Sequence, residues 1–285
     1  MTDYQFRAIT GQDIPSMTRL LMARQERESQ LFPFLKNSFL QTGRTREQLQ
    51  NLLASGNALG MGVFFHGQLV GYLVGTIRID TRTGRCVVVP YEGAAIAEDQ
   101  PAELIRHLYA EASVPWLDHG CFTHSAFVPL AASRYLEAFS KLSFGMEQVY
   151  AVLDLEEYRP FKKAAEVGIR LATEEDSEIM GRMASIISKH QNAAPTFIPV
   201  FPEILAEIRE GFQRSLQDQD TVVLLAEKDG EAVGFHMYIA ASPSIMAPDR
   251  SVQLVVAGTV QGHRRSGIGQ SLMDAACFSH PWAEN

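Results

Sequence analysis

Hydrophobic residues in the second half of the chain fall into runs and stripes that predict a hairpin, a further strand and a helix. Residues 222–240 read VVLLAEKDGEAVGFHMYIA, in which Asp-Gly separates two β-rich runs, as in a tight hairpin. Residues 252–260 (VQLVVAGTV) are apolar almost throughout, which is typical of a central strand. In residues 268–280 the apolar side chains recur with helical spacing, and one face carries Ile268, Leu272, Ala275 and Ala276.

The first half of the chain repeats this pattern at a constant spacing of 163 residues. Residues 6–21 align with residues 169–184, each as a short strand, a capping region and an amphipathic helix. The identical pairs include Arg7/Arg170, Thr10/Thr173, Asp13/Asp176, Met17/Met180 and Arg19/Arg182. Residues 67–75 (GQLVGYLVG) align in the same way with residues 230–238 (GEAVGFHMY). Two matched segments in the same order predict an internal repeat.

Each copy is predicted to contain a strand, two helices, three strands and a helix. We therefore expect an α/β (α+β) protein of two tandem domains, each a mixed, mostly antiparallel sheet with helices on both faces. The domains would span residues 1–155 and 168–285. The charged stretch 156–167, with its helix-breaking proline, would link them.

Only the first copy has a continuation after its last shared helix. Residues 121–129 predict a strand, residues 131–145 a helix, and residues 146–155 (MEQVYAVLDL) a final strand. We therefore expect the second domain to be incomplete, without its last strands and helix. The outer edge of the strand before its last helix would then lie open. The side chains expected to be partly exposed on that helix are Leu272, Ala276 and Phe278.

Positive charge and backbone freedom are concentrated between the last strand and the last helix. The junction reads QGHRRSGIG and contains Arg264, Arg265, Gly267 and Gly269. Glycine lets backbone amides approach a ligand closely, and a helix N-terminus presents unpaired N–H groups with a partial positive charge. Together with two guanidinium groups, these features predict an anion site, and phosphate is the commonest occupant of such sites.

Two familiar phosphate-binding motifs do not fit this junction. A Walker loop requires a lysine after its second glycine, and none is present here. A dinucleotide-binding fingerprint requires GxGxxG within a βαβ unit, whereas Gly267-x-Gly269 is followed by Leu272. The pattern Arg-x-x-Gly-x-Gly after a strand does fit. A basic turn that only caps the helix is the simplest alternative.

This pattern, at this place in the order of strands and helices, resembles motif A of the GNAT superfamily of acyl-CoA-dependent N-acyltransferases. The resemblance implies that the amides of residues 265–270 hold the pyrophosphate of coenzyme A, and that strand 254–260 pairs with the pantetheine arm. It also implies acetyl-CoA as co-substrate, and no metal. The coenzyme-binding residues that it implies are Thr259, Val260, Arg264, Arg265, Ser266, Gly267, Ile268, Gly269 and Gln270.

The first copy carries the opposite charge at the corresponding junction. At a spacing of 166 residues, Glu98 and Asp99 replace the two arginines, and Pro101 replaces the first glycine of the pattern. Carboxylates repel a pyrophosphate, and proline lacks an amide donor. The resemblance further implies that Phe139 stands where many members have a tyrosine as general acid. We therefore expect a degenerate first domain without a coenzyme site.

Acyl transfer to an amine requires a base for the ammonium group and an acid for the departing thiolate. His236 is the candidate base, because it shares one face of its strand with Tyr238 and could act directly or through water. A structural histidine is the alternative. His263, in the junction itself, is expected to pack rather than to react. The helical tyrosine of the superfamily has no counterpart in the second copy, so the sequence names no acid.

Composition and charge narrow the class of protein. Apolar residues make up 46% of the 285 residues and charged residues 20%, as in a soluble globular protein. The chain has neither an apolar run that could cross a bilayer nor a signal peptide, which predicts a cytoplasmic protein. A net charge of −8 argues against a nucleic-acid partner. The three cysteines, predicted to be reduced and buried, are Cys86, Cys121 and Cys277.

The resemblance to the GNAT superfamily implies an N-acetyltransferase that would move an acetyl group from acetyl-CoA to a primary amine, and direct attack is expected because no nucleophilic Cys or Ser is placed for a covalent intermediate. Its partners would be an acyl-CoA and an amine-bearing substrate, with no nucleic acid and no membrane. Self-association through the open sheet edge is a further option. The alternative is a non-catalytic or decayed protein that binds acyl-CoA, or only a partner. Coenzyme binding without turnover would favour that alternative.

Overall fold

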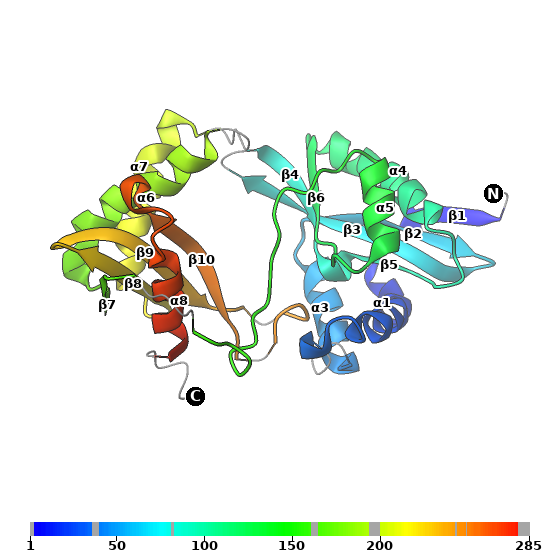
Figure 1. The fold of residues 1–285 in the computed structure, drawn as a ribbon. Helices are drawn as coiled ribbons and strands as arrows, with labels where there is room; N and C mark the ends of the chain where they lie inside the picture. Colours follow the sequence, from blue (N-terminus) through cyan, green and yellow to red (C-terminus); the bar gives the residue numbers. More distant parts are fainter. Residues whose placement is uncertain are drawn as a thin grey trace. The chain divides into compact units, whose positions relative to one another are not determined.

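The computed structural model describes residues 3–35, 40–80, 83–160, 165–193, 200–242, 244–248 and 250–278. The chain divides into two compact units, each with its own sheet (Figure 1). Unit 1 comprises Met1–Tyr150 and Pro243–Asp249, and unit 2 comprises Ala151–Ser242 and Arg250–Asn285. Each unit has a mostly antiparallel sheet with helices on both faces, which confirms the predicted fold class.

Unit 1 is built on a six-stranded sheet in the order β1-β2-β3-β4-β6, with β5 also paired to β3. The strands are β1 (Tyr4–Ala8), β2 (Ala58–Phe65), β3 (Gln68–Asp80), β4 (Gly84–Val89), β5 (Ala94–Ile96) and β6 (Thr123–Ala126). The helices are α1 (Ile14–Ser29), α3 (Thr42–Ala54), α4 (Glu103–Asp118) and α5 (Ser133–Lys141). Apolar side chains of α1 and α3 cover one face, and those of α4 and α5 cover the other.

Unit 2 has a four-stranded antiparallel sheet in the order β10-β9-β8-β7 within its described residues. The strands are β7 (Gly168–Leu171), β8 (Thr221–Lys228), β9 (Glu231–Ala240) and β10 (Val252–Thr259). The helices are α6 (Ser177–Gln191), α7 (Pro202–Arg214) and α8 (Ile268–Phe278). Helix α8 packs on one face of the sheet and α6 on the other (Figure 1).

The alternation of side chains along β8 explains the two cores of unit 2. Leu224 and Ala226 pack with the apolar face of α8, whereas Val223 and Leu225 pack with α6. The Asp-Gly turn that leads into β9 has positive φ at both residues, 52° at Asp229 and 81° at Gly230. Both central residues of a type I′ turn need such values, so the predicted hairpin is confirmed.

The expected exposure of the last helix is wrong for two of its three residues. Leu272 and Ala276 are buried, at 0% and 4% exposure, and Phe278 is 56% exposed. The first two lie in the core between α8 and the sheet. Strand β10 does lie at the edge of the described sheet, although its sequence is typical of a central strand.

The segment before β7 also packs along α8. The Tyr158 hydroxyl donates to Asp274 Oδ1 at 2.6 Å, and the amide of Ala165 donates to Ser271 Oγ at 2.8 Å. Helix α8 therefore has a neighbour that the repeat pattern did not indicate, because these contacts come from the region predicted as a linker.

The final strand predicted for the first copy is not formed. Residues 146–155 have no β-structure. Their exposed apolar side chains are Met146, Val149, Tyr150, Val152, Leu153 and Leu155. An alternating apolar pattern becomes a strand only where a neighbour supplies hydrogen-bonding partners, and this segment has no paired strand in the structure. The domain boundaries at residues 155 and 168 stay a prediction.

A short piece of the second half of the chain belongs to the core of unit 1. Ile245 is fully buried among apolar side chains of α1 and α3. Arg44 on α3 donates from Nη2 to the carbonyl oxygen of Ser244 at 2.9 Å. The connection between β9 and β10 therefore completes the packing of unit 1, and sequence periodicity offers no signal for such a contact.

The same capping arrangement begins the first helix of each unit. In unit 2, Arg170 donates from both terminal nitrogens to Asp176, at 2.7 and 2.8 Å, and the amide of Thr173 donates to the same carboxylate at 2.8 Å. In unit 1, Arg7 contacts Asp13 in the same way, at 2.7 and 2.9 Å. These contacts explain the matched arginine, threonine and aspartate of the two halves.

Replacing Asp176 with alanine should destabilise unit 2 by about 2–3 kcal/mol, because a helix cap and charge-assisted hydrogen bonds are lost together. The Arg170 guanidinium lowers the pKa of Asp176 to about 2, so this stabilisation is present above about pH 4 and is lost as the pH falls toward 2. Denaturant unfolding at pH 7 measures the loss. Glu174→Ala, on the same turn but exposed, is the control and should change stability by less than about 0.5 kcal/mol.

Candidate functional site

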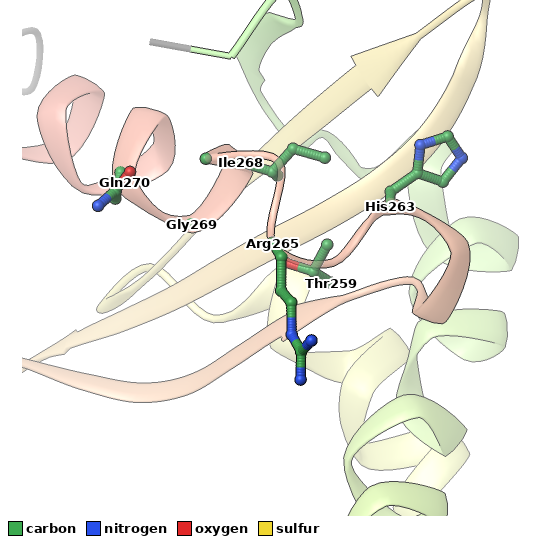
Figure 2. Close-up of a pocket in the computed structure, with 7 residues that line it drawn as sticks. Thr259, His263, Arg265, Ile268, Gly269 and Gln270 are labelled. Carbon is green, nitrogen blue, oxygen red and sulfur yellow. The ribbon is translucent and has the colours of Figure 1, made fainter. Parts of the chain in front are cut away.

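The basic junction forms one wall of a cavity in unit 2. The cavity has a volume of about 470 Å³ and lies where β10 leads through the 3-10 turn Gln261–His263 into α8 (Figure 2). Its lining residues are Thr259, His263, Arg265, Gly267, Ile268, Gly269 and Gln270. Six of the nine coenzyme-binding residues predicted from the resemblance are therefore brought together around one cavity. The other three, Val260, Arg264 and Ser266, do not line it.

Two residues of the junction have left-handed backbone conformations. Gly267 has φ of 88°, and Arg265 has φ of 61°, in the left-handed region that non-glycine residues rarely adopt. Holding an arginine there costs about 1–3 kcal/mol, and residues with such strain cluster at ligand-binding sites. The strained residue is also the arginine that lines the cavity (Figure 2).

Six consecutive amides are left available by this conformation. Within the described chain, the N–H groups of residues 265–270 donate to no protein acceptor, and the amide of Ser271 is the next to bond, to the carbonyl oxygen of Gly267 at 3.0 Å. The first amides of a helix carry a partial positive charge. Together with Arg265, which lines the same cavity, these donors form a site that suits an anion such as a phosphate.

The three predicted residues that do not line the cavity contact other parts of unit 2. Arg264 turns back along the chain, and its Nε donates to the carbonyl oxygen of Thr259 at 3.1 Å. Ser266 Oγ donates to the carbonyl oxygen of His263 at 2.6 Å. Val260 packs with the apolar side chains on the α6 face of the sheet. Arg264 Nη1 also lies 3.3 Å from His190 Nδ1 on α6, so one of the two predicted arginines is occupied by contacts within the protein itself.

His263 is a cavity residue that the sequence reasoning assigned to packing. It lies on the 3-10 turn Gln261–His263 and is among the residues that line the cavity, and in Figure 2 its imidazole points to the opposite side of the loop from the Arg265 side chain. The signal that could have found it is its position, two residues before that arginine in a turn that directly follows a strand.

The structure places His236 beneath the start of α8 rather than in the cavity lining. The side chain is 5% exposed, and its Nδ1 lies 2.9 Å from the Tyr238 hydroxyl. A Cβ atom on Gly269 would lie 3.9 Å from His236 Nε2. Its place on the face shared with Tyr238 is as predicted, whereas its role as a base stays a prediction.

Burial lowers the pKa of His236 to about 4, so the folded protein holds this imidazole neutral at pH 7. The unfolded chain protonates it near pH 6.5, which means that the unfolded state binds more protons as the pH falls. The free energy of unfolding of unit 2 should therefore decrease between about pH 6.5 and pH 4, by up to about 3 kcal/mol from this residue.

A His236→Gln variant should lose that component of the pH dependence, because the amide carries no titrating proton. The measurement is the difference in unfolding free energy between wild type and variant at pH 7.5 and at pH 4.5. His190→Gln, an exposed histidine of the same unit, is the matched control. A difference that stays constant between the two pH values would show that His236 is not held neutral by burial.

Among the residues that the structure describes, no three His, Cys, Asp or Glu side chains lie close enough together to hold a metal ion. In the same residues no helix is long and apolar enough to span a membrane. Cys86 and Cys121 are buried, as predicted, and Cys277 is partly buried.

Comparisons with known proteins identify similar folds. No protein family and no curated protein matches the sequence. One similar structure is a ribosomal-protein-alanine N-acetyltransferase from Brucella melitensis biovar Abortus 2308, at 13% identity and TM-score 0.41, covering 53% of this chain and 98% of that chain. A transcriptional regulator from Bacillus halodurans C-125 has 16% identity and TM-score 0.41, covering 53% and 99%. An aminoglycoside N-acetyltransferase in complex with CoA has 15% identity and TM-score 0.39, covering 55% and 93%.

Proposed function

We propose that unit 2 binds an acyl-CoA at the basic junction and that the chain is a tandem member of the GNAT superfamily. The observation that carries the proposal is the row of six amides without protein acceptors at residues 265–270, at the wall of a cavity that Arg265 also lines. The pyrophosphate of coenzyme A would accept hydrogen bonds from these amides. The edge of β10 would pair with the pantetheine arm, because this strand has a free side in the described sheet.

The proposed reaction is transfer of an acetyl group from acetyl-CoA to a primary amine by direct attack. The amine nitrogen forms a bond to the acetyl carbonyl carbon, the carbon–sulfur bond breaks, and the amine loses one proton while the thiolate gains one. The proton of the amine needs an acceptor, and His263, which lines the cavity among the residues proposed to hold the pyrophosphate, lies at the wrong end of the coenzyme to accept it. His236 would need the start of α8 to move before it could do so.

Unit 1 would have no coenzyme site at the corresponding place. Glu98 stands there with its carboxylate 3.6 Å from Arg27, and Asp99 and Pro101 follow it. Negative charge and a missing amide donor both disfavour a pyrophosphate. Unit 1 would then have a structural role.

A non-catalytic acyl-CoA-binding protein is the second candidate function. The observation that favours it is the lack of a tyrosine, cysteine or carboxylic acid among the described residues that line the cavity. Coenzyme binding depends only on local amides and Arg265, and so it does not require that acid.

Two measurements on the full chain test the proposal and separate the candidates. Isothermal titration with coenzyme A and with acetyl-CoA should give one site per chain. Release of free thiol from acetyl-CoA in the presence of a panel of primary amines should then report turnover. Binding with turnover supports the acetyltransferase, and binding without turnover supports the second candidate. Absence of binding to either coenzyme overturns both.

A further inference from the structure

Unit 1 contains a hollow of its own, away from the junction that would correspond to the coenzyme site. It has a volume of about 140 Å³, less than a third of that of the cavity in unit 2, and lies between the second half of α1 and the start of α5. Its polar lining side chains are Arg24, Arg27, Glu28, Ser133, Arg134 and Tyr135. Three guanidinium groups therefore meet one carboxylate around a small space.

Arg24 is a buried cation that the fold does not fully satisfy. Its side chain is 2% exposed and stacks between the rings of Tyr91 and Tyr135, each centroid 4.2 Å from Cζ. Nε donates to Glu28 at 2.9 Å, and Nη1 donates to backbone carbonyls. Nη2 is buried and has no hydrogen-bond partner within the described chain. A buried guanidinium nitrogen without an acceptor is costly, so an acceptor from a ligand would stabilise it.

Tyr135 adds a second donor to the same hollow. Its hydroxyl oxygen accepts a hydrogen bond from the amide of Ile96 at 3.0 Å, and its own proton has no acceptor among the described residues. The ring is 5% exposed, and burial raises the pKa of this hydroxyl, which therefore keeps its proton at neutral pH. Two buried donors from different elements therefore lie beside this hollow without an acceptor among the described residues.

The one carboxylate in the lining, that of Glu28, already accepts two hydrogen bonds from the protein. Glu28 accepts from Arg24 Nε through Oε1 and from the Tyr91 hydroxyl through Oε2, at 2.9 and 2.6 Å. Arg134 at the rim contacts only backbone carbonyls, those of Glu98 and Gln100. Arg27 lies 3.6 Å from the Glu98 carboxylate, so the three guanidinium groups exceed the carboxylates near them by one, and the hollow keeps spare hydrogen-bond donors.

We propose that this hollow binds a small oxyanion, namely a free carboxylate or phosphate ion or the same group at the end of a small molecule. Arg24 Nη2 and the Tyr135 hydroxyl are the inner donors, and Arg27 and Arg134 supply charge at the rim. The volume suits such a group and is too small for a coenzyme. The inference concerns unit 1 and is independent of the function proposed for unit 2.

The test is a thermal-unfolding and calorimetric titration of the full chain with inorganic phosphate and, separately, with acetate, against chloride at equal ionic strength. A saturable rise in unfolding temperature with one anion, absent with chloride, is expected. The stronger of the two responses identifies the ligand as a phosphate or a carboxylate. No saturable response to either anion overturns the proposal.

Two variants assign the response to this hollow. Arg134→Gln should weaken the anion affinity by about tenfold, since hydrogen bonds to charged groups contribute on that scale. Lys141→Gln removes one charge from the other end of α5, where the lysine pairs with Glu137, and should leave the affinity unchanged. Equal weakening by both variants would mean a general charge effect and would overturn the proposal.

A second variant distinguishes anion binding in the hollow of unit 1 from anion binding at the junction of unit 2. The titration is repeated in Gln270→Glu, which places a carboxylate at that junction. A response that persists there belongs to unit 1, whereas a response that disappears belongs to the junction and overturns the assignment to the hollow. Loss of coenzyme binding in this variant bears on unit 2 alone, so the two proposals fail separately.

Discussion

Replacing Gln270 with glutamate should lower the affinity of the protein for coenzyme A by about a hundredfold and leave the fold intact. Gln270 is the third residue of α8, and its side chain lines the cavity. A carboxylate there would lie beside the pyrophosphate of the proposed site, and two like charges about 4 Å apart cost several kcal/mol near a protein surface. The same carboxylate in the first turn of a helix stabilises the helix by about 0.3–1 kcal/mol.

The substitution is expected to weaken coenzyme binding while it slightly stabilises the helix, so lost binding in this variant cannot be attributed to unfolding. The measurement is isothermal titration with coenzyme A, accompanied by circular dichroism on heating. Gln217→Glu, an exposed position of unit 2 outside the cavity, adds the same charge and should bind as wild type does. Unchanged affinity in Gln270→Glu would remove the junction from consideration as the pyrophosphate site.

Replacing Glu28 with alanine should destabilise unit 1 by about 3–5 kcal/mol, which is the usual effect of removing one partner of a buried ion pair. Arg24 and Glu28 are one turn apart on α1, and their side chains are 2% and 8% exposed. The Glu28 carboxylate also accepts from the Tyr91 hydroxyl at 2.6 Å. Its loss would remove the carboxylate that the buried guanidinium and the buried hydroxyl both contact.

Chemical denaturation followed by circular dichroism measures this change. Glu26→Ala, an exposed position on the same helix, controls for helix propensity and should change stability by less than about 0.5 kcal/mol. The double variant Arg24→Met/Glu28→Leu should recover much of the loss, because apolar side chains often replace a buried ion pair without cost. If Glu28→Ala costs no more than Glu26→Ala, the buried pair does not stabilise the unit.

The sequence determined the elements whose signals are local. The Asp-Gly hairpin, the strand before the junction and the helix after it follow from turn chemistry and from periods of two and 3.6 residues. The matched Arg-Thr-Asp set in each half follows from short-range capping, since its members lie within seven residues of one another. The prediction of an anion site at residues 264–270 likewise rested on local signals, namely glycines, arginines and a helix start.

Only the tertiary structure decided which side chains turn toward the cavity and which remain packed. Arg264 and Arg265 are adjacent in sequence, yet one bonds back to Thr259 and the other, at a φ of 61°, lines the cavity. The apolar pattern at 146–155 predicted a strand, but pairing depends on a neighbour that no local pattern specifies.

The sequence also did not predict that Ile245 is buried in unit 1 or that one nitrogen of Arg24 is unpaired. Each depends on residues far apart along the chain, which folding brings into one core. A sequence pattern specifies what a segment can form and what chemistry its side chains carry. The long-range packing of the chain decides which polar groups find hydrogen-bonding partners, because that packing alone decides where water is excluded.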